Sequence, residues 1–411
     1  MVVPYLKGSR KITNFQIIVR QRLQQISERR SVARGYLVRV GFGVTALAKG
    51  MARMSLDGIG VHTRHLLENL EVLGDIQVSR LAFGANFARS FAGPTEITNS
   101  FRVIAAWSFF TGLAYPGLKN FFRDIDVFHA PDHHIPKSLN TPIVATIHDA
   151  IPISNPEWNT MRYRTLIAPV FKRTASWANK IITVSNYSKC SLVEHFNISS
   201  ELIAVVPNGV DKSWFNPSKP EAISDLRKRY DLPRRYIISV GTLQPRKNTL
   251  RLIEAYCSLP QDLQKNHDLV LVGREGWKCQ SILSRVSQGA PYGRILWLRY
   301  LPDDELQLLV KAAECFAFPS LSEGFGLPVL EAFAGKVPVI TSNVTALPEV
   351  AGDAAVLVDP YTIDSIVHEL SRVLDDTTLS NNLRSRGSDR AKLFSWEQVA
   401  SRTINVYRGV L

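Results

Sequence analysis

The stretch from Phe318 to Glu331 reads FPSLSEGFGLPVLE, and its pattern is the main indication of the fold of this chain. The apolar run 313–318 indicates a buried strand. Gly324 and Gly326 follow in a loop where the backbone can approach a ligand closely. Pro328 is typical of the first turn of a helix, which the run VLEAFAG continues. A strand, a glycine loop and a helix N-terminus together predict a site for phosphate or another anion.

Two carboxylates bracket this loop. Glu323 precedes it, and Glu331 is expected within the first turn of the helix. Repulsion should keep both from contacting the same phosphate, so each is expected to accept hydrogen bonds from hydroxyl groups. Taken singly, either residue has a plainer explanation: the helix dipole favours Glu331, and Glu323 is solvated.

The whole string resembles the signature of family 4 glycosyltransferases, in which seven residues, here GFGLPVL, separate two glutamates. The resemblance continues through 341–360, TSNVTALPEVAGDAAVLVDP, and back to 241–256, GTLQPRKNTLRLIEAY. It implies that Glu331 binds the ribose of a nucleotide. It also implies that the donor sugar is held by Glu323 and by the residues that follow it, namely Gly324, Phe325, Gly326 and Leu327.

Length and composition are those of a globular protein with two domains. The chain has 411 residues, of which 45% are hydrophobic and 21% charged. No run approaches about 18 consecutive apolar residues, so no membrane span is expected. The four cysteines are scattered without zinc-binding spacing, which predicts cytosolic thiols and no structural zinc. The family resemblance implies that the protein needs no metal or other cofactor.

The positive charge is concentrated at the amino terminus. Residues 1–53 contain eleven Lys and Arg against Glu28 alone, a net of +10 out of +13 for the chain. The rest is nearly neutral, which disfavours nucleic acid as a partner.

The segment 1–34 is predicted to be a basic amphipathic extension. Its apolar residues Phe15, Val19, Leu23 and Ile26 form one stripe on a helix over 13–30. Such a helix is typical of attachment to an anionic membrane surface. This reading places a cytoplasmic protein at the inner face of the inner membrane. A solvated extension and an organelle transit peptide are the alternatives.

Repeated strand–helix units predict parallel sheets. The first domain is expected over 35–218, a linker over 219–232, the second domain over 233–393, and a helix crossing back to the first domain over 394–411. The family resemblance implies the α/β fold called GT-B, with two Rossmann-like domains facing across a cleft. The first domain would hold the acceptor and the second the sugar nucleotide.

The turn DGIG at 57–60 resembles the GGIG loop that faces the donor in this family. Gly58 and Gly60 match it, whereas Asp57 replaces the first glycine and His62 stands where the family usually has an aromatic residue. A plain turn between strand and helix is the alternative.

The histidines of the first domain have structural and functional interpretations. A lone histidine such as His148 in TIHD is more often structural, but the resemblance places it against the donor sugar. Asp149 is expected to hold a neighbouring backbone group or histidine. His129, His133 and His134 fit no metal-ligand spacing, and a loop facing the acceptor is preferred.

Arg246 and Lys247 follow a strand that ends at Gly241, and such cations suit a diphosphate. Solvated surface cations are the alternative, but the pair matches the diphosphate-binding pair of the family. The expected catalytic set is therefore His148, Arg246, Lys247 and Glu323. The donor-binding set also includes Gly58, Gly60, Gly241, Gly273, Tyr300 and Leu301, with the last two beside the nucleobase.

The activity expected from the resemblance is retaining transfer of a sugar to a glycan or lipid-linked glycan. The strings TLQPRKN, GREGW and SNVTALPEVAGDAA are most similar to the mannosyltransferase branch that uses GDP-mannose in bacterial surface polysaccharide synthesis. A UDP- or dTDP-sugar donor, carrying N-acetylglucosamine or rhamnose, is an alternative. A sugar-nucleotide epimerase and a non-catalytic GT-B protein are others.

Overall fold

The computed structural model describes residues 37–52, 56–84, 95–158 and 164–411. The predicted amphipathic extension 1–34 lies outside these ranges. Within them, every helix is too short or too polar to cross a lipid bilayer.

The first half of the chain forms a sheet of seven parallel strands. Most are short apolar runs whose residues are buried, as in sheets covered on both faces. In sheet order the strands are β3 (Thr95–Thr98), β2 (Ile76–Phe83), β1 (Val38–Gly43), β4 (Val127–Ala130), β5 (Ile143–Thr146), β6 (Lys180–Thr183) and β7 (Ile203–Val205). The helices are α2 (Thr45–Ala52), α3 (Gly58–Leu73), α4 (Phe101–Thr111), α5 (Leu118–Phe121), α6 (Ile151–Ser154), α7 (Arg164–Ala175) and α8 (Asn186–Phe196).

The second half forms a parallel sheet of six strands. In sheet order they are β10 (Ile295–Leu298), β9 (His267–Val272), β8 (Arg235–Val240), β11 (Cys315–Phe318), β12 (Val339–Ser342) and β13 (Val356–Val358). The helices are α9 (Pro220–Arg229), α10 (Thr249–Cys257), α11 (Gln261–Asn266), α12 (Gln280–Gln288), α13 (Asp303–Lys311), α14 (Leu327–Ala334), α15 (Leu347–Ala351), α16 (Ile363–Asp375) and α17 (Thr377–Ala391). The predicted α/β architecture with two parallel sheets is confirmed.

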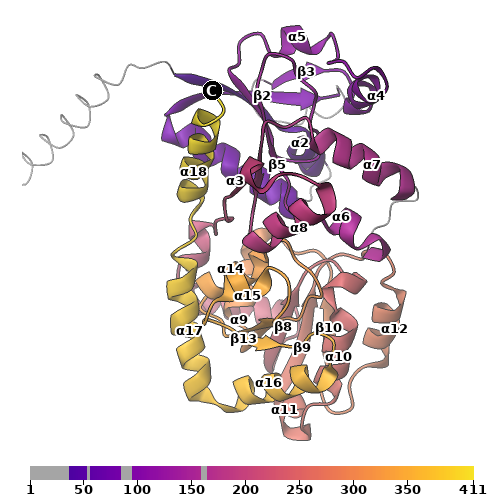
Figure 1. The fold of residues 1–411 in the computed structure, drawn as a ribbon. Helices are drawn as coiled ribbons and strands as arrows, with labels where there is room; N and C mark the ends of the chain where they lie inside the picture. The colour runs from indigo at the N-terminus through magenta and orange to yellow at the C-terminus, as the bar shows by residue number, and fades with distance from the viewer. Residues whose placement is uncertain (1–36, 53–55, 85–94, 159–163) are drawn as a thin grey trace, which may run out of the picture.

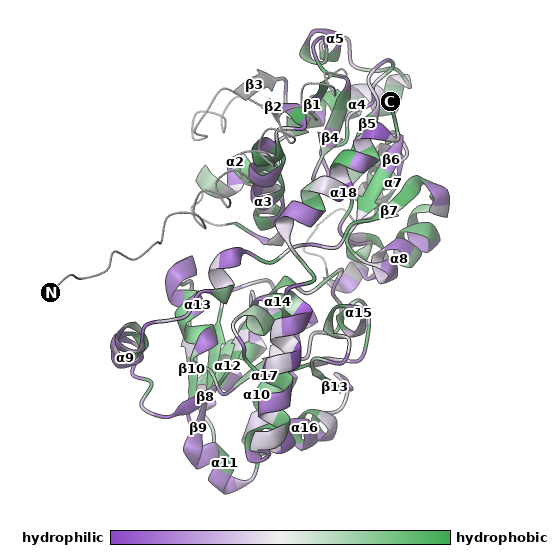
Figure 2. Ribbon diagram, turned by 90° about the vertical axis from the view of Figure 1, so that its left-hand side faces the viewer, coloured by the Kyte–Doolittle hydropathy of each residue, from purple (hydrophilic) through white to green (hydrophobic). Residues whose placement is uncertain are grey.

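Each sheet is covered by apolar side chains on both faces, so the molecule has four buried clusters. Figure 2 shows the hydrophobic residues gathered on the strands and the hydrophilic ones on the outer helices. This burial explains why many of the strands are apolar runs rather than alternating patterns.

The strand order reverses once in each sheet, between β1 and β4 and between β8 and β11. Loops that follow the two central strands diverge at such a switch point, and open parallel sheets bind ligands there. The fold therefore marks the loops after β8 and β11 as candidates for a site.

The last helix, α18 (Trp396–Arg408), packs on the first half of the chain, although α17 belongs to the second half (Figure 1). Trp396 and Tyr407 are buried there in the cluster around β1. The hydroxyl of Tyr407 lies 2.7 Å from Nδ1 of His129 in β4. The structure thus contains the crossing helix expected for residues 394–411.

The structure differs from the sequence-based expectation in the range 219–232. This segment was expected to be a linker, but it contains α9, which packs on α13. Leu226 is buried in the core of the second half. Although the segment is mostly polar, its helix buries Leu226 and so packs as part of the second half.

Candidate functional site

Two loops meet at the switch point of the second sheet. Residues 241–248 follow β8 and residues 319–326 follow β11. These strands are parallel neighbours, so both loops emerge at the same edge. The N–H of Leu321 donates to the carbonyl of Arg246 at 2.8 Å and joins them.

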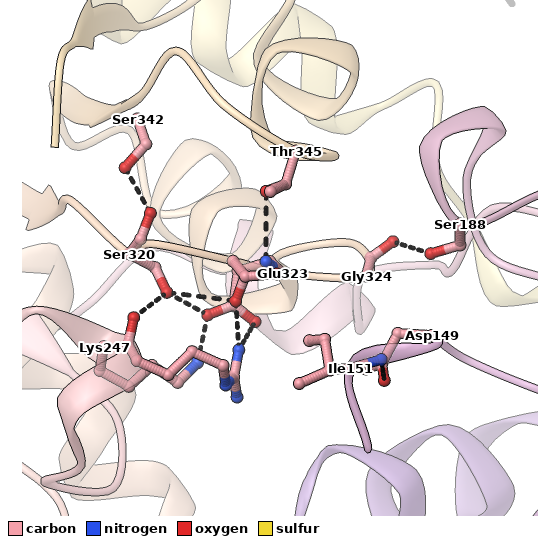
Figure 3. Close-up of polar contacts among 11 residues, drawn as sticks. Asp149, Ile151, Ser188, Lys247, Ser320, Glu323, Gly324, Ser342 and Thr345 are labelled. Carbon is pink, nitrogen blue, oxygen red and sulfur yellow. Dashed lines mark hydrogen bonds and ion pairs between the residues drawn. The ribbon is translucent and has the colours of Figure 1, made fainter. Parts of the chain in front are cut away.

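Glu323 connects the two loops through its carboxylate (Figure 3). Oε2 lies 2.9 Å from Nη1 of Arg246, and Oε1 lies 2.7 Å from Nζ of Lys247. The hydroxyl of Ser320 also donates to Oε1, at 2.7 Å. Glu323 is only 8% exposed, so water screens these charges weakly.

The two cations keep Glu323 ionised. Burial alone would raise its pKa, but Arg246, Lys247 and the hydrogen bonds lower the pKa to about 2. The sequence predicted that this carboxylate accepts hydrogen bonds from hydroxyl groups. The structure shows it paired with the same two cations that were expected to hold a diphosphate.

The loop that carries the cations is itself firmly held. Pro245–Lys247 forms a short 3₁₀ turn, and Arg246 also donates to the carbonyl of Ser322. The side-chain amide of Asn248 donates to the carbonyls of Pro319 and Pro360, at 2.9 and 2.7 Å. The cation pair is therefore positioned before any ligand arrives.

The glycine loop touches the first half of the molecule. The carbonyl of Gly324 accepts hydrogen bonds from the hydroxyls of Ser185 and Ser188, at 2.7 and 3.0 Å. A Cβ at this position would lie 2.6 Å from the carbonyl oxygen of His148. Gly324 thus permits close approach of the two halves. Gly326 has φ +108°, which favours glycine, and forms the N-cap of α14.

Glu331 lies just beyond the first turn of α14, within which the sequence predicted it. The helix begins at Leu327, so Glu331 is its fifth residue and not part of its first turn. Its carboxylate has no hydrogen bond or ion pair within the described ranges. Burial, with repulsion from Asp303 and Asp211, raises its pKa to about 7. It is therefore available to bind a ligand.

The turn predicted to hold a nucleobase lies near Glu331. Asp303, which begins α13 just after this turn, interacts with Glu331 electrostatically. The ring of Tyr300 is half exposed, and the guanidinium carbon of Arg274 lies 4.4 Å from its centroid. Leu301 is buried in the core, so Tyr300 presents the accessible side chain of this turn.

Gly241 and Gly273 lie directly after β8 and β9 and allow these strand ends to approach. A Cβ on Gly273 would lie 2.0 Å from the carbonyl oxygen of Gly241, so no side chain fits. A Cβ on Gly241 would lie 3.5 Å from Cε of Lys247. These glycines therefore shape the loop that carries Lys247.

Like Leu301, two further residues predicted to bind the donor, Phe325 and Leu327, turn their side chains towards the hydrophobic core. The ring of Phe325 packs 6.0 Å from that of Phe394. Leu327 is partly buried between the cores of the two halves. Only their backbone groups are left to contact a donor, because apolar side chains at this junction are sequestered from water.

The backbone carbonyl of His148 adjoins the glycine loop from the first half. Its Nε2 lies 3.3 Å from the carbonyl oxygen of Pro131, which makes Nε2 the donor. Burial lowers the pKa of His148 to about 3, so the ring is neutral at neutral pH. The prediction that Asp149 holds a neighbouring backbone group is confirmed, because its Oδ1 accepts from the N–H of Ile151 at 3.0 Å.

The start of α3 completes the first half's contribution. Asp57 lies close enough to His148 to influence its pKa, which brings Gly58 and Gly60 into the same region. The rings of His62 and His148 pack edge to face with centroids 4.6 Å apart. Through these contacts, the predicted residues of both halves lie around the junction between the two sheets.

Several residues of the site were not predicted from the sequence. Asn208 accepts a hydrogen bond from Nδ1 of His62 at 2.8 Å and so fixes the ring against His148. Ser320 bonds Glu323, and Ser185 bonds Gly324. A serine or asparagine in a loop has no pattern that would distinguish it from a turn residue.

The three histidines considered as a metal cluster do not lie together in one loop. His129 belongs to β4, where its ring bonds Tyr407 and Thr146. Among the described residues, no group of three or more His, Cys, Asp or Glu is arranged to hold a metal ion.

Two family models match this chain. The model "Glycosyltransferase Family 4" matches residues 56–214, and "Glycosyl transferases group 1" matches residues 208–390. Together they cover the second sheet, the first sheet except β1, and the loops described above.

Curated relatives and a solved structure agree with these models. The O-antigen chain mannosyltransferase B of Escherichia coli is 31% identical over 368 residues, covering 86% of this chain and 96% of the relative. The serotype-specific mannosyltransferase WbdA of Escherichia coli is 30% identical over 65% of this chain, which spans only 33% of WbdA. The crystal structure of Anabaena HepE with UDP-glucose is 17% identical, with a TM-score of 0.70 over 90% of this chain and 99% of HepE.

Proposed function

This chain belongs to the glycosyltransferase family that these models describe, and from that premise we propose that it transfers mannose from GDP-mannose to a glycan or lipid-linked glycan. The glycosyltransferase activity follows from the family. Support for mannose comes from the relatives, because mannosyltransferase B and WbdA both carry that activity in their names.

The contact of Arg246, Lys247 and Glu323 at the switch point is the observation that carries the proposed mechanism. When the bond between the anomeric carbon and the diphosphate oxygen breaks, negative charge develops on the leaving GDP. A positioned cation pair stabilises that charge as it develops. In this mechanism the pair supplies positive charge without a resident metal.

The remaining residues would orient the donor. Glu331, which has no partner within the described ranges, is suited to accept hydrogen bonds from the ribose hydroxyls. Neutral His148 adjoins, through its backbone carbonyl, the glycine loop that would hold the sugar. Retention of the anomeric configuration is part of the proposal, as in the family. A lipid-linked acceptor would place the enzyme at the cytoplasmic surface of a membrane.

A panel of sugar nucleotides tests the proposal by thermal unfolding. A donor at 100 times its Kd stabilises the protein by about 2.7 kcal/mol. We expect this shift with GDP-mannose and a smaller one with UDP-glucose, UDP-N-acetylglucosamine and dTDP-rhamnose. Preferential stabilisation by a UDP- or dTDP-sugar would overturn the choice of donor.

Product analysis separates the rival activities. With GDP-mannose and an oligomannose acceptor, we expect a glycan that is longer by one mannose, with the α configuration of the donor. Conversion of the donor to another sugar nucleotide without acceptor would show an epimerase. Binding without turnover on any offered acceptor would support a non-catalytic protein.

A further inference from the structure

Helix α4 (Phe101–Thr111) is apolar around most of its circumference. Ile104, Ala105 and Ser108 are buried against the first half. Val103, Trp107 and Phe110 occupy positions i, i+4 and i+7 and form a stripe on the opposite side. A helix that is apolar on all sides is normally enclosed by protein or lipid. In α4 this second side is exposed.

The exposed residues form one cluster, which we call the α4 surface: Val103, Trp107, Phe109, Phe110 and Leu113. Phe110 is 82% exposed and Leu113 is 60% exposed. Single exposed apolar residues are ordinary, but a contiguous group on one element marks an interaction site.

The charge around the α4 surface is predominantly positive. From Asn99 to Arg123 the chain contains Arg102, Lys119 and Arg123 and no acidic residue. All three cations are exposed. Lys119 lies in α5, and both views place α5 beside α4 at the same end of the molecule (Figures 1 and 2). Asp124, which follows Arg123, is an exposed carboxylate, so three cations face one anion and the charge beside the apolar cluster is positive on balance.

We propose that the α4 surface docks on an anionic lipid bilayer. Tryptophan and phenylalanine side chains insert at the boundary between headgroups and acyl chains, while Arg and Lys pair with anionic headgroups. This docking does not require the proposed transfer reaction. The suggestion that docking gives the enzyme access to a lipid-linked acceptor rests on the proposed function.

A second copy of the chain fits this surface less well. A twofold contact through α4 would bring Arg102, Lys119 and Arg123 towards the same residues of the other copy. Like charges would then repel across the contact. An anionic bilayer offers the complementary charge.

The α4 surface is connected to the site through the first residue of the helix. The ring of Phe101 packs 4.9 Å from that of His134, in the loop that follows β4. Pro131 of the same loop accepts the hydrogen bond from His148. Docking through α4 would hold this edge of the first sheet at a fixed orientation to the membrane.

Vesicle sedimentation of the full-length protein tests the proposal without acceptor or donor. Vesicles contain phosphatidylcholine with or without phosphatidylglycerol, and the test variant is Phe110→Glu/Leu113→Glu. The control is Val72→Glu, since Val72 is 84% exposed on α3. We expect the affinity for the phosphatidylglycerol vesicles to be at least tenfold weaker in the test variant and unchanged in the control. Wild-type affinity in the test variant would overturn the proposal.

Deletion of residues 1–34 separates the α4 surface from the basic extension. The double substitution should weaken binding in the shortened chain as well as in the full-length one. If binding depends on residues 1–34 alone, the proposal is wrong. In the chain without residues 1–34, neutralising Arg102, Lys119 and Arg123 to Gln should abolish the preference for phosphatidylglycerol, and an unchanged preference there would also refute the proposal.

Two further measurements distinguish the alternatives. Sedimentation velocity without vesicles should give the same mass for wild type and test variant; a smaller mass for the variant would assign the surface to self-association. Hydrolysis of the sugar nucleotide should be unchanged by the double substitution, because both residues are remote from the catalytic set. If the double substitution lowered both the rate of hydrolysis and the unfolding temperature, the weaker binding would result from misfolding. That outcome would remove the support for docking.

Discussion

Glu323 and Glu331 are the same residue type eight positions apart, yet their surroundings shift their pKa values in opposite directions. Arg246 and Lys247 hold the pKa of Glu323 at about 2. Burial, with Asp303 and Asp211 nearby, raises that of Glu331 to about 7. One carboxylate is therefore a fixed anion that positions two cations, and the other changes its charge near neutral pH.

Glu331 makes the stability of the folded protein depend on pH. Folding raises its pKa from 4.5 to about 7, so the unfolded chain ionises first as the pH rises. The free energy of unfolding therefore falls between these two pH values. We expect Glu331→Gln to be more stable than wild type by about 3 kcal/mol at pH 8 and nearly equal at pH 4. Urea denaturation at both pH values measures this difference.

The exposed Glu194 provides the control for this substitution. Glu194→Gln should change the free energy of unfolding by less than about 0.5 kcal/mol at either pH, as for most surface substitutions. If Glu331→Gln changed stability equally at pH 4 and pH 8, packing and not ionisation would be responsible.

At the scale of residues, the sequence identified the main participants but not their pairing. The resemblance of their motifs to the family signature singled out Arg246, Lys247 and Glu323. Their mutual contacts join positions about 76 residues apart and depend on the adjacency of β8 and β11. Phe325 was chosen with its neighbours in the motif, but the fold turns its ring into the core.

At the scale of elements, the start of α3 explains a departure from the family pattern. Asp57 stands where the family has glycine, and its Oδ1 accepts a hydrogen bond from the N–H of Gly60 at 2.8 Å. Asp57 is thus the N-cap of α3. Its side chain satisfies one of the free N–H groups of the first turn.

Substitution of Asp57 tests this capping role. Asp57→Ala should lower the free energy of unfolding by about 1 kcal/mol, whereas Asp57→Gly should lower it by only a few tenths. Glycine leaves the first turn open to water, which replaces the lost acceptor. Urea denaturation of the two variants in parallel provides the comparison. An alanine variant as stable as the glycine variant would contradict the capping role.

The elements themselves could largely be predicted, since short apolar runs gave the strands and turn residues gave the boundaries. Ser185, for example, is a typical N-cap residue, and its hydroxyl accepts from the N–H of Ser188 at the start of α8. The exception is α9, whose polar sequence indicates a linker. Its helical structure depends on burial of Leu226 in the second half, which local sequence does not reveal.

At the scale of the whole molecule, the chain passes between the halves twice, and the two crossings lie side by side. Val210 pairs with Ser395. A Cβ on Gly209 would lie 2.5 Å from the backbone nitrogen of Trp396. The sequence predicted a final crossing helix, but it could not show that this helix becomes part of the core around β1.

A second connection between the halves lies beside the site. Glu349 in α15 accepts hydrogen bonds from the N–H and the side-chain amide of Asn186 and from the N–H of Tyr187, at 2.8–3.3 Å. A carboxylate from the second half thus caps α8 of the first half, where the helix dipole favours negative charge. Together with Ser185 and Ser188 on Gly324, it keeps the halves closed.

Loss of this connection should impair catalysis more than folding. Glu349→Ala removes a charged acceptor worth about 1.5–3 kcal/mol, so we expect kcat to fall about tenfold as the closed arrangement becomes less populated. Glu349→Gln, which keeps an acceptor oxygen, should lose less. Asp353→Ala is the control, since Asp353 is exposed near the end of the same helix and pairs with Arg386 of its own half. Small-angle scattering should show a larger radius of gyration for Glu349→Ala alone. An unchanged radius and kcat in that variant would mean that other contacts hold the halves together.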